Sequence, residues 1–337
     1  MKVLQEGRGE LLGWMPPDVA RKWMMENKKP SLIDKTMSLP DAVRKYTRDG
    51  DYFAMGGFGH IRYSSAAIYE MIRQGRKNMI NAGKTAVHDI DILVAGGVVD
   101  RVECAYSFGH ELRGLSPAGR RAVESGRVKV VGELSNAGFQ WRFKAAAMGL
   151  PWFPARVMLG TDTLNYSSAK VVEDPMTGKP ITLLPACYPE FSLIHVHRCD
   201  KYGNCQIDGT SIEDVDLARA SKRLIITTEK IIDEEEIRDH PDRTLIPYFY
   251  VDAVVKVPFG SHPGNMPGLY YSDEEHMAEW LSLSRSDEGV QEYFDKYVYS
   301  VKDFQDYIEL VGGAEKMEYL RKLEKLETPF KAPWARR

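Results

Sequence analysis

The sequence predicts an α/β fold, with helices on both faces of an open and mostly parallel sheet. Two observations lead to this fold class. From Ser38 onwards, segments with the composition of strands alternate with segments of helical character. Several strand segments are also continuous runs of Val, Ile and Leu, which is typical of strands that are buried on both faces.

The first elements of this alternation are delimited by capping residues. Ser38 and Pro40 in "SLPDAVRKYT" predict the start of a helix, because serine caps helix N-termini and proline is tolerated in the first turn. "DGDYFAMGGF" then has the pattern of a turn, a short buried strand and a glycine-rich loop. "SSAAIYEMIRQG" predicts a helix that begins at Ser64 or Ser65 and ends at Gly75.

Further strands and helices follow in the same manner. We expect strands in "DILVAGG" (91–97), "VECAYS" (102–107), "VKVVGEL" (128–134), "FSLIHVHRCD" (191–200), "RLIITTE" (223–229) and "VDAVVKVP" (251–258). We expect helices in "PAGRRAVESG" (117–126), "GFQWRFKAAAMGL" (138–150) and "IEDVDLARAS" (212–221). The predicted organisation is an N-terminal arm (residues 1–34), an α/β domain (35–272) and a helical C-terminal extension (273–337).

The composition excludes several classes of protein. The 337 residues are 43% hydrophobic and 28% charged, which is typical of globular proteins. A net charge of −3 argues against a nucleic-acid-binding protein or one that binds anionic membranes. No apolar run approaches the length of a bilayer span, no secretory signal is visible, and 4 cysteines do not make a disulfide framework. We therefore expect a reduced, cytoplasmic enzyme without membrane or nucleic-acid partners.

A possible metal site occurs in "IHVHRCDKYGNC". In a strand His195, His197 and Cys199 would share one face, and Cys205 follows after a turn. The spacing H-x-H-x-C-x5-C nevertheless matches no common zinc site, in which a C-x-x-C pair normally joins a second close pair. We therefore predict no metal here, and expect His195 to make internal hydrogen bonds.

Other functional motifs are incomplete. "NAGKT" ends like a phosphate-binding loop, but Asn78 stands where the leading glycine is needed. "GGFGHI" lacks the third glycine of a dinucleotide-binding fingerprint, because Arg62 stands there. The sequence has no G-x-S-x-G nucleophile elbow.

Several segments, taken in order, are more informative than any single motif. They are "GDYFAMGGFGHIRYSSAAIYEMIRQG", "FKAAAMGLPWFPAR" followed by "GTD", "IHVHRCDKYGN", "TTEKIIDEEEIR", "VDAVVKVPFGSHPG" and "GLYYSDEEH". Over about residues 35–315 the chain thereby resembles the A (α) subunits of family I CoA-transferases, in particular those of the glutaconate type.

The resemblance implies a function and a partner. Enzymes of this family use a glutamate nucleophile that takes CoA from an acyl-CoA thioester and passes it to a second carboxylate. In the glutaconate type that glutamate lies on a separate B (β) subunit, and this chain has no B-type Glu-Asn-Gly element. We therefore expect a heterotetramer or larger assembly acting on an acyl-CoA and a carboxylic acid, possibly a dicarboxylic acid. Coenzyme A would be substrate and product, with no permanently bound cofactor and no metal.

The glycine-rich loop is the first candidate substrate-binding segment. Gly56, Gly57 and Phe58 follow a strand and could present free N–H groups to a carboxylate or oxyanion. Arg62 could pair with a substrate carboxylate or a CoA phosphate. Alternatively, the glycines only make a tight strand-to-helix turn.

A second candidate segment is "AYSFGHELRG" (105–114). In the glutaconate type the matching loop holds small polar residues near the dicarboxylate, whereas this chain has Ser107, Phe108 and His110. The histidine and the aromatic ring would change the size and polarity of the pocket, so the acyl group need not be glutaconyl. His110 could equally be an exposed loop residue without a role.

The third candidate segment is the end of the strand predicted at 128–134. Glu133 could act as a general base or nucleophile, or as a structural hydrogen-bond acceptor. Ser135 and Asn136 are plausible helix caps and possible substrate contacts.

Two alternative functions remain open. Some members of the superfamily are hydrolases, including ring-opening ones that depend on an A-chain glutamate, and others are decarboxylases, so Glu133 could serve such a reaction. The chain could also be a non-catalytic scaffold subunit that completes an interface.

Overall fold

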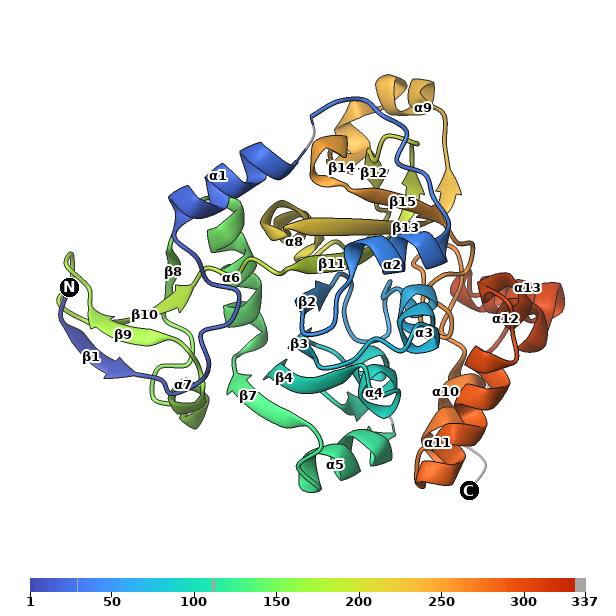
Figure 1. Cartoon of the computed structure of the whole chain (residues 1–337), viewed down its shortest axis with the longest axis horizontal. Helices are drawn as coiled ribbons and strands as arrows, with labels where there is room; N and C mark the ends of the chain where they lie inside the picture. The colour runs from blue at the N-terminus through green and yellow to red at the C-terminus, as the bar shows by residue number, and fades with distance from the viewer. Residues whose placement is uncertain (29, 111–112, 331–337) are drawn as a thin grey trace.

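The centre of the computed structural model, which describes residues 1–28, 30–110 and 113–330, is a nine-stranded sheet with helices on both faces (Figure 1). The predicted α/β fold class is therefore confirmed. Seven strands run parallel in the order β15-β13-β11-β2-β3-β4-β7. They are β2 (Tyr52–Met55), β3 (Met79–Lys84), β4 (Val99–Ala105), β7 (Lys129–Glu133), β11 (Phe191–Cys199), β13 (Arg223–Ile231) and β15 (Ala253–Lys256).

Two short antiparallel strands extend the sheet beside β11. β12 (Cys205–Gln206) pairs with the end of β11, and β14 (Thr244–Ile246) pairs with β12. β2 pairs with β11 only up to Met55, opposite Leu193, so the rest of β11 continues beyond the end of β2.

The sheet separates two hydrophobic cores. Successive residues of a strand point to opposite faces, so Phe53 and Met55 lie in one core while Tyr52 and Ala54 lie in the other. The helices of the first core are α2 (Leu39–Tyr46), α3 (Ser65–Arg73), α4 (His88–Ala95), α5 (Pro117–Glu124), α10 (Glu274–Leu283), α11 (Asp287–Phe294), α12 (Phe304–Leu310) and α13 (Gly313–Glu324), with a π-helical turn η3 (Asp295–Tyr299). The helices of the second core are α1 (Pro17–Asn27), α6 (Asn136–Ala147), α7 (Asp162–Tyr166) and α8 (Asp214–Ala220).

The predicted helical tail is present as α10 to α13, at the right in Figure 1. Trp280, Tyr293 and Tyr307 are fully buried and share one core with α3 and α4. The tail is therefore packed on the α/β domain as part of its hydrophobic core. Across the described ranges, no helix combines the length and the apolar character needed to cross a membrane.

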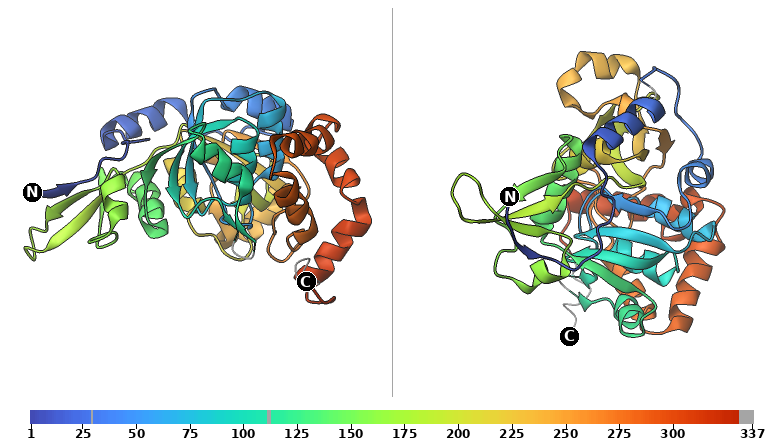
Figure 2. Two further views of the ribbon diagram at one scale, coloured as in Figure 1. Left: turned by 90° about the horizontal axis from the view of Figure 1, so that it is seen from below. Right: turned by 60° about the vertical axis from the view of Figure 1, so that its left-hand side comes forward.

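A second sheet was not predicted. It is antiparallel, has the order β1-β9-β10-β8, and projects from the main body beside the N-terminus (Figure 2). Its strands are β1 (Val3–Glu6), β8 (Trp152–Ala155), β9 (Lys170–Glu173) and β10 (Pro180–Pro185). The smaller remaining elements are a hairpin of β5 (Gly109–His110) and β6 (Gly114–Leu115), helix α9 (Glu234–Asp239), and the 3-10 turns η1 (Pro241–Arg243) and η2 (Tyr248–Tyr250).

The strand predicted at residues 91–97 is wrong, because this run lies in helix α4. Every residue of α4 from His88 to Val94 is buried, so the run is apolar without an amphipathic period. A short apolar run of this kind cannot be assigned to helix or strand by periodicity. The strand between β2 and β4 is β3, where Asn81, Gly83 and Lys84 weaken the strand pattern.

The arm of residues 1–34 packs against its own chain. β1 pairs with β9, and the backbone N–H of Glu10 donates to the Val131 carbonyl oxygen over 3.0 Å. At the end of α1, Lys28 forms an ion pair with Asp252, whose carboxylate also accepts from the backbone N–H of Leu224 over 2.7 Å. The arm therefore joins the second sheet to the edge of the main sheet.

Arg142 of α6 holds several layers together. Its guanidinium is fully buried in an ion pair with Glu103 of β4. It also donates to the carbonyl oxygens of Leu12 in the arm, over 2.7 Å, and Pro185 of β10, over 2.9 Å. Tyr52 donates its hydroxyl to the second oxygen of Glu103. One side chain thus connects the main sheet, the second sheet and the arm.

Replacing Arg142 with methionine should destabilise the protein by about 3–5 kcal/mol, because Glu103 would remain buried and charged without its partner. The measurement is urea unfolding, together with limited proteolysis of the arm, which should be cut faster. The control is Arg44→Met, since Arg44 forms an ion pair with Asp41 in which both side chains are exposed (65% and 62%), and solvent screening leaves such a pair little effect on stability. Equal losses in both variants would contradict the role of Arg142.

Candidate functional site

The carboxyl ends of β2, β3, β4 and β7 lie side by side at one edge of the sheet. In α/β folds this edge is where ligands bind, because the loops and helix N-termini meet there. The ends of these strands and the segments that follow them carry all the candidate catalytic and substrate-binding residues: Gly56, Gly57, Phe58, Arg62, Ser107, Phe108, His110, Glu133, Ser135 and Asn136.

The glycine-rich loop after β2 is packed too tightly for side chains. Gly57 has φ +76°, and a Cβ there would lie 2.2 Å from the carbonyl oxygen of Ile61. A Cβ on Gly56 would lie 2.5 Å from a carboxylate oxygen of Asp214. Side chains at Gly56 and Gly57 would collide with their surroundings, which favours the interpretation of these glycines as a tight turn.

The expected free N–H groups of this loop are already engaged. The N–H of Gly56 donates to Leu193 O over 2.8 Å, and the N–H of Phe58 donates to Ile61 O over 3.0 Å. The N–H of Gly57 donates to Oδ1 of Asp214 over 3.1 Å. The loop therefore shapes this edge of the sheet, and its amides are not available to an oxyanion in this conformation.

Arg62 lies away from the surface where a substrate contact was expected. Its side chain is fully buried and forms a two-point ion pair with Asp214, over 2.6 Å and 3.2 Å. It also donates to the carbonyl oxygens of His195, over 3.3 Å, and Thr210, over 2.8 Å. Since its charge is neutralised inside the protein, this geometry favours a structural role: Arg62 fastens the glycine-rich loop to the start of α8.

A second buried ion pair lies beside the first. Lys84, at the end of β3, is 2.6 Å from a carboxylate oxygen of Glu213, and its ammonium donates to Gly57 O over 3.2 Å. Burial raises the pKa of Glu213 to about 7. Two adjacent acids, Glu213 and Asp214, are therefore paired with two buried basic side chains beside the glycine-rich loop.

Sequence reasoning missed Lys84, Glu213 and Asp214. Lys84 lies in "NAGKT", which has the wrong spacing for a phosphate loop, and the acids resemble an ordinary solvated helix start. The signal that could have found them is Arg62 beside a glycine-rich turn, because an arginine buried at such a position needs an acidic partner.

The loop after β4 supplies a half-buried serine and two buried rings. Ser107 donates its hydroxyl to Gly83 O over 2.9 Å. Phe108 has φ +66°, and its ring lies so close to Gly119 that a Cβ there would be 2.4 Å away. His110 is 1% exposed, so the alternative of an exposed loop histidine is excluded.

His110 belongs to a cluster of three histidines from three successive loops. Its ring lies 5.3 Å from that of His60, after β2, and 6.1 Å from that of His88, at the start of α4. Among the described residues, the ring nitrogens of His88 and His110 have no hydrogen-bond partner. Burial lowers the pKa of His110 to about 3, with His60 and Arg113 adding to the effect. Burial also lowers the pKa of His88 well below its usual value. The rings of His88 and His110 are therefore neutral at physiological pH.

Glu133 ends β7 beside Cys104 and is half-buried. It forms no ion pair with any described residue, unlike Glu213 and Asp214. Ser135 is the N-cap of α6 and accepts from Gly138 N over 3.0 Å. The amide oxygen of Asn136 accepts from the hydroxyl of Thr85 over 3.1 Å, which joins the loops after β3 and β7.

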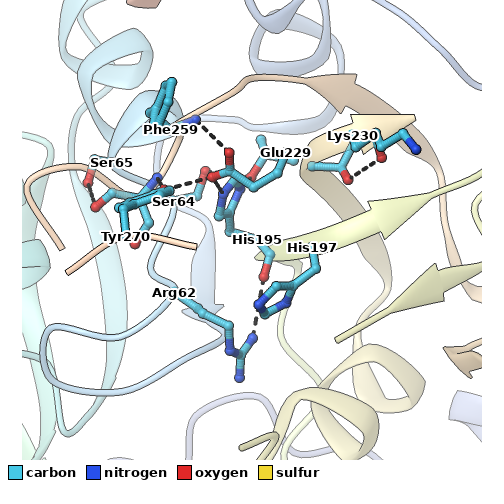
Figure 3. A network of polar contacts seen from close by, with 12 residues as sticks. Arg62, Ser64, Ser65, His195, His197, Glu229, Lys230, Phe259 and Tyr270 are labelled. Atoms are coloured by element: carbon cyan, nitrogen blue, oxygen red, sulfur yellow. Dashed lines mark hydrogen bonds and ion pairs between the residues drawn. The ribbon is translucent and has the colours of Figure 1, made fainter. Parts of the chain in front are cut away.

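The side chain of His195 makes the internal hydrogen bonds expected from the sequence (Figure 3). Its Nδ1 lies 2.8 Å from the hydroxyl of Thr227, which contacts the hydroxyl of Ser64 over 2.9 Å. Its Nε2 lies 2.8 Å from Glu229, which also accepts from the hydroxyl of Tyr270 over 2.6 Å. This network connects the glycine-rich loop to β11 and β13.

The neighbouring residues of "IHVHRCDKYGNC" are also engaged by protein groups. Nε2 of His197 contacts Pro267 O over 2.8 Å, and its Nδ1 accepts from Asp208 N over 3.0 Å. Asp200 holds the following turn through the backbone N–H groups of residues 202–204. Within the described ranges, no group of His, Cys, Asp or Glu side chains has the geometry of a metal site.

Comparison with known proteins gives consistent results. A sequence model of the family described as Coenzyme A transferase matches residues 36–257. The A chain of glutaconate CoA-transferase from Acidaminococcus fermentans is 30% identical over 298 residues, which cover 83% of this chain and 93% of that protein. The crystal structure of glutaconate coenzyme A-transferase from the same organism superposes with a TM-score of 0.81 at 30% identity, covering 85% of this chain and 95% of that chain.

Two further proteins are similar. An uncharacterized protein of Archaeoglobus fulgidus is 59% identical over 334 residues, which cover 99% of this chain and 75% of that protein. A variant of the decarboxylase AibA/AibB superposes with a TM-score of 0.68 at 31% identity, covering 78% of this chain and 100% of that chain.

Gly57→Ala should disrupt the loop, whereas Gly59→Ala should be tolerated. Both glycines have positive φ, which alone costs an alanine about 1 kcal/mol. Only at Gly57 would the Cβ also meet a backbone oxygen at 2.2 Å, whereas at Gly59 no described atom lies within 4 Å. Urea unfolding should therefore show a loss of about 1 kcal/mol for Gly59→Ala and roughly threefold more for Gly57→Ala. Similar losses would disprove the steric argument.

The buried histidines should make the protein sensitive to acid. The pKa of His110 is about 3 in the folded protein and about 6.5 when exposed, so below pH 6.5 the unfolded chain binds a proton that the folded chain does not. The free energy of unfolding should therefore decrease as the pH is lowered. For His110 alone, the decrease from pH 7.5 to pH 5 should be about 2 kcal/mol. The measurement is urea unfolding of wild type, His110→Gln and the exposed-site control His240→Gln at pH 7.5 and pH 5.

Only His110→Gln should show a smaller loss between the two pH values. If both variants lose as much free energy of unfolding as the wild type between pH 7.5 and pH 5, His110 is not the titrating group.

Proposed function

The chain belongs to the coenzyme A transferase family, and from this premise we propose that it is the α-type half of a heteromeric enzyme that moves CoA between an acyl-CoA thioester and a carboxylic acid. The observation that supports this most directly is the likeness to glutaconate CoA-transferase, in sequence over 83% of the chain and in structure with a TM-score of 0.81. The same likeness implies a B-type partner subunit, and we propose a heterotetramer or larger assembly. Localisation in the cytoplasm is part of the same proposal.

The proposed division of labour between the subunits follows from the charges at the sheet edge. A CoA transfer needs a carboxylate nucleophile that can reach the thioester carbon. Glu213 and Asp214 are buried and paired with cations, so neither can serve. The nucleophile would then be the glutamate of the partner subunit, and Glu133 would face the shared site as a base or hydrogen-bond acceptor.

The acyl group is proposed to lie over the ends of β3, β4 and β7. Phe58, Ser107 and Glu133 are half-buried there and could contact a ligand without rearrangement. Asn136 lies on the same edge, and Ser135 contributes by fixing the start of α6. Phe108 and His110 would form the inner wall, so an acyl group with a polar end fits better than a purely apolar one.

A decarboxylase or hydrolase is the second candidate function. The likeness to the decarboxylase AibA/AibB at 31% identity favours it, as does the uncommitted carboxylate of Glu133. In such an enzyme Glu133 would act on the substrate itself, and no glutamate on the partner would be needed. A non-catalytic scaffold role remains the alternative of a different class.

The deciding experiment is co-expression with a B-type subunit, incubation with a panel of acyl-CoA thioesters, and mass spectrometry of both chains. Transfer predicts a CoA adduct on a glutamate of the partner, and the adduct should still form in a Glu133→Gln complex. Free CoA or CO2 without an adduct, lost in Glu133→Gln but kept in the exposed control Glu173→Gln, would establish a hydrolase or decarboxylase. A complex that is inactive with every thioester and has no adduct would leave the scaffold role.

A further inference from the structure

Two cysteines lie opposite each other where strand β11 ends and pairs with β12. Cys199 is the last residue of β11 and Cys205 the first of β12, and the two are directly opposite in the antiparallel register. Their sulfur atoms are 3.3 Å apart, and both side chains are fully buried. The proposed function makes no use of either residue.

The backbone geometry at this position suits a covalent link. The N–H of Asp200 donates to Asn204 O over 3.1 Å, so the adjacent pair, Cys199 and Cys205, is the type without backbone hydrogen bonds between its members. In such pairs the Cα atoms are about 4.5 Å apart, within the range of about 4.4–6.8 Å that disulfides span. Little backbone movement is therefore needed for a bond.

We propose that Cys199 and Cys205 are a disulfide-forming pair that a small hydroperoxide oxidises. One thiol loses its proton, the thiolate attacks a peroxide oxygen, and the O–O bond breaks to give a sulfenic acid and hydroxide, which takes up the released proton as water. The sulfur of the second cysteine then attacks the sulfenic sulfur, the S–O bond breaks, and its proton leaves with the hydroxide as water. In sum, two thiols and one hydrogen peroxide give one disulfide and two waters.

The reduced pair is protected until the segment opens. Cys199 donates to Asp200 O and Cys205 donates to Gly203 O, each over 3.2 Å. Burial raises the pKa of Cys199 well above its usual range, with Cys205 adding to the effect, so the reactive thiolate is scarce. Oxidation should therefore be slow in the folded state and should follow local opening of β12 and β14, which are short strands at one edge of the sheet.

The bond would restrain a segment that matters for the candidate site. Cys205 begins the stretch that contains Thr210, Glu213 and Asp214, the residues that hold Arg62 and Lys84. Joining Cys205 to β11 fixes one end of this stretch. In the oxidised protein, the ion pairs of Glu213 and Asp214 with Lys84 and Arg62 should therefore persist to a higher temperature.

The other two cysteines provide a built-in comparison. Cys187 is buried and contacts the hydroxyl of Tyr52 over 3.6 Å, and Cys104 is half-buried beside Glu133. Of the four cysteines, all within the described ranges, Cys199 and Cys205 are the two whose sulfur atoms contact each other.

The test treats the reduced, purified full chain with hydrogen peroxide, blocks remaining thiols under denaturing conditions, and maps tryptic peptides without reduction. The expected product links peptide 199–201 to peptide 202–219 and is released by a reductant, in wild type and in the control Cys104→Ser. The unfolding temperature of the oxidised protein should rise by about 3 °C, and should return on reduction.

Two results would overturn the proposal. One is a wild-type chain in which Cys199 and Cys205 are still alkylated, or carry separate sulfinic acids, while other thiols have reacted. The other is a linked peptide whose formation and reduction leave the unfolding temperature of the wild-type chain unchanged, which would remove the proposed restraint. In Cys205→Ser, where no link can form, peroxide should cause no such rise, and an equal rise there would also count against the pair.

Discussion

The arrangement of the candidate site depends on two adjacent buried acids. Glu213 and Asp214, at the start of α8, lie against Lys84 and Arg62, which come from two neighbouring strand ends. Burying four charges is costly unless each is paired and hydrogen-bonded, so these contacts leave little freedom in how the loop after β2 can be placed. Gly56 and Gly57 follow from the same constraint, because a side chain at either position would collide with the acid or with the loop itself.

Because of this constraint, the residues at the sheet edge fall into two groups: those engaged in internal ion pairs and those that could contact a ligand. Arg62, Lys84 and the N–H of Gly57 could attract an anionic substrate, but all three are engaged by Asp214 or Glu213. In the proposed function the ligand would contact Phe58, Ser107, Glu133 and Asn136, and the buried ring of the nearby His110 is neutral. Among the described residues, this edge supplies no nucleophile paired with a base, which is consistent with the proposal that the site is shared with a partner subunit.

Two further ion pairs attach the arm and the second sheet to the main sheet. Arg142 and Glu103 form a buried pair that also holds the arm and the second sheet, and Lys28 with Asp252 fixes the end of α1. Both pairs join segments that are far apart in the sequence. The N-terminal segment is therefore part of the folded unit, although its composition alone suggested an appended arm.

The sequence by itself determined the fold class, most elements and the family. Alternation of strand and helix patterns, and caps such as Ser38 and Ser135, are local properties that need no knowledge of the rest of the chain. The same holds for the ordered motifs, which led to the coenzyme A transferase family before any geometry was known. Locality also explains the errors. Helix α4 is buried on all sides, so its apolar run has no helical period, and the second sheet pairs β1 (Val3–Glu6) with β9 (Lys170–Glu173), which is remote in the sequence.

Only the tertiary structure decided what the individual residues do. Arg62 could be a substrate clamp or an internal fastener, and the choice depends on Asp214, which is 152 residues away in the chain and 2.6 Å away in space. His110 could be exposed or buried, and the answer depends on the loops that carry His60 and His88. Burial and long-range pairing set charge, accessibility and pKa, and neither can be obtained from the residue types along a single chain.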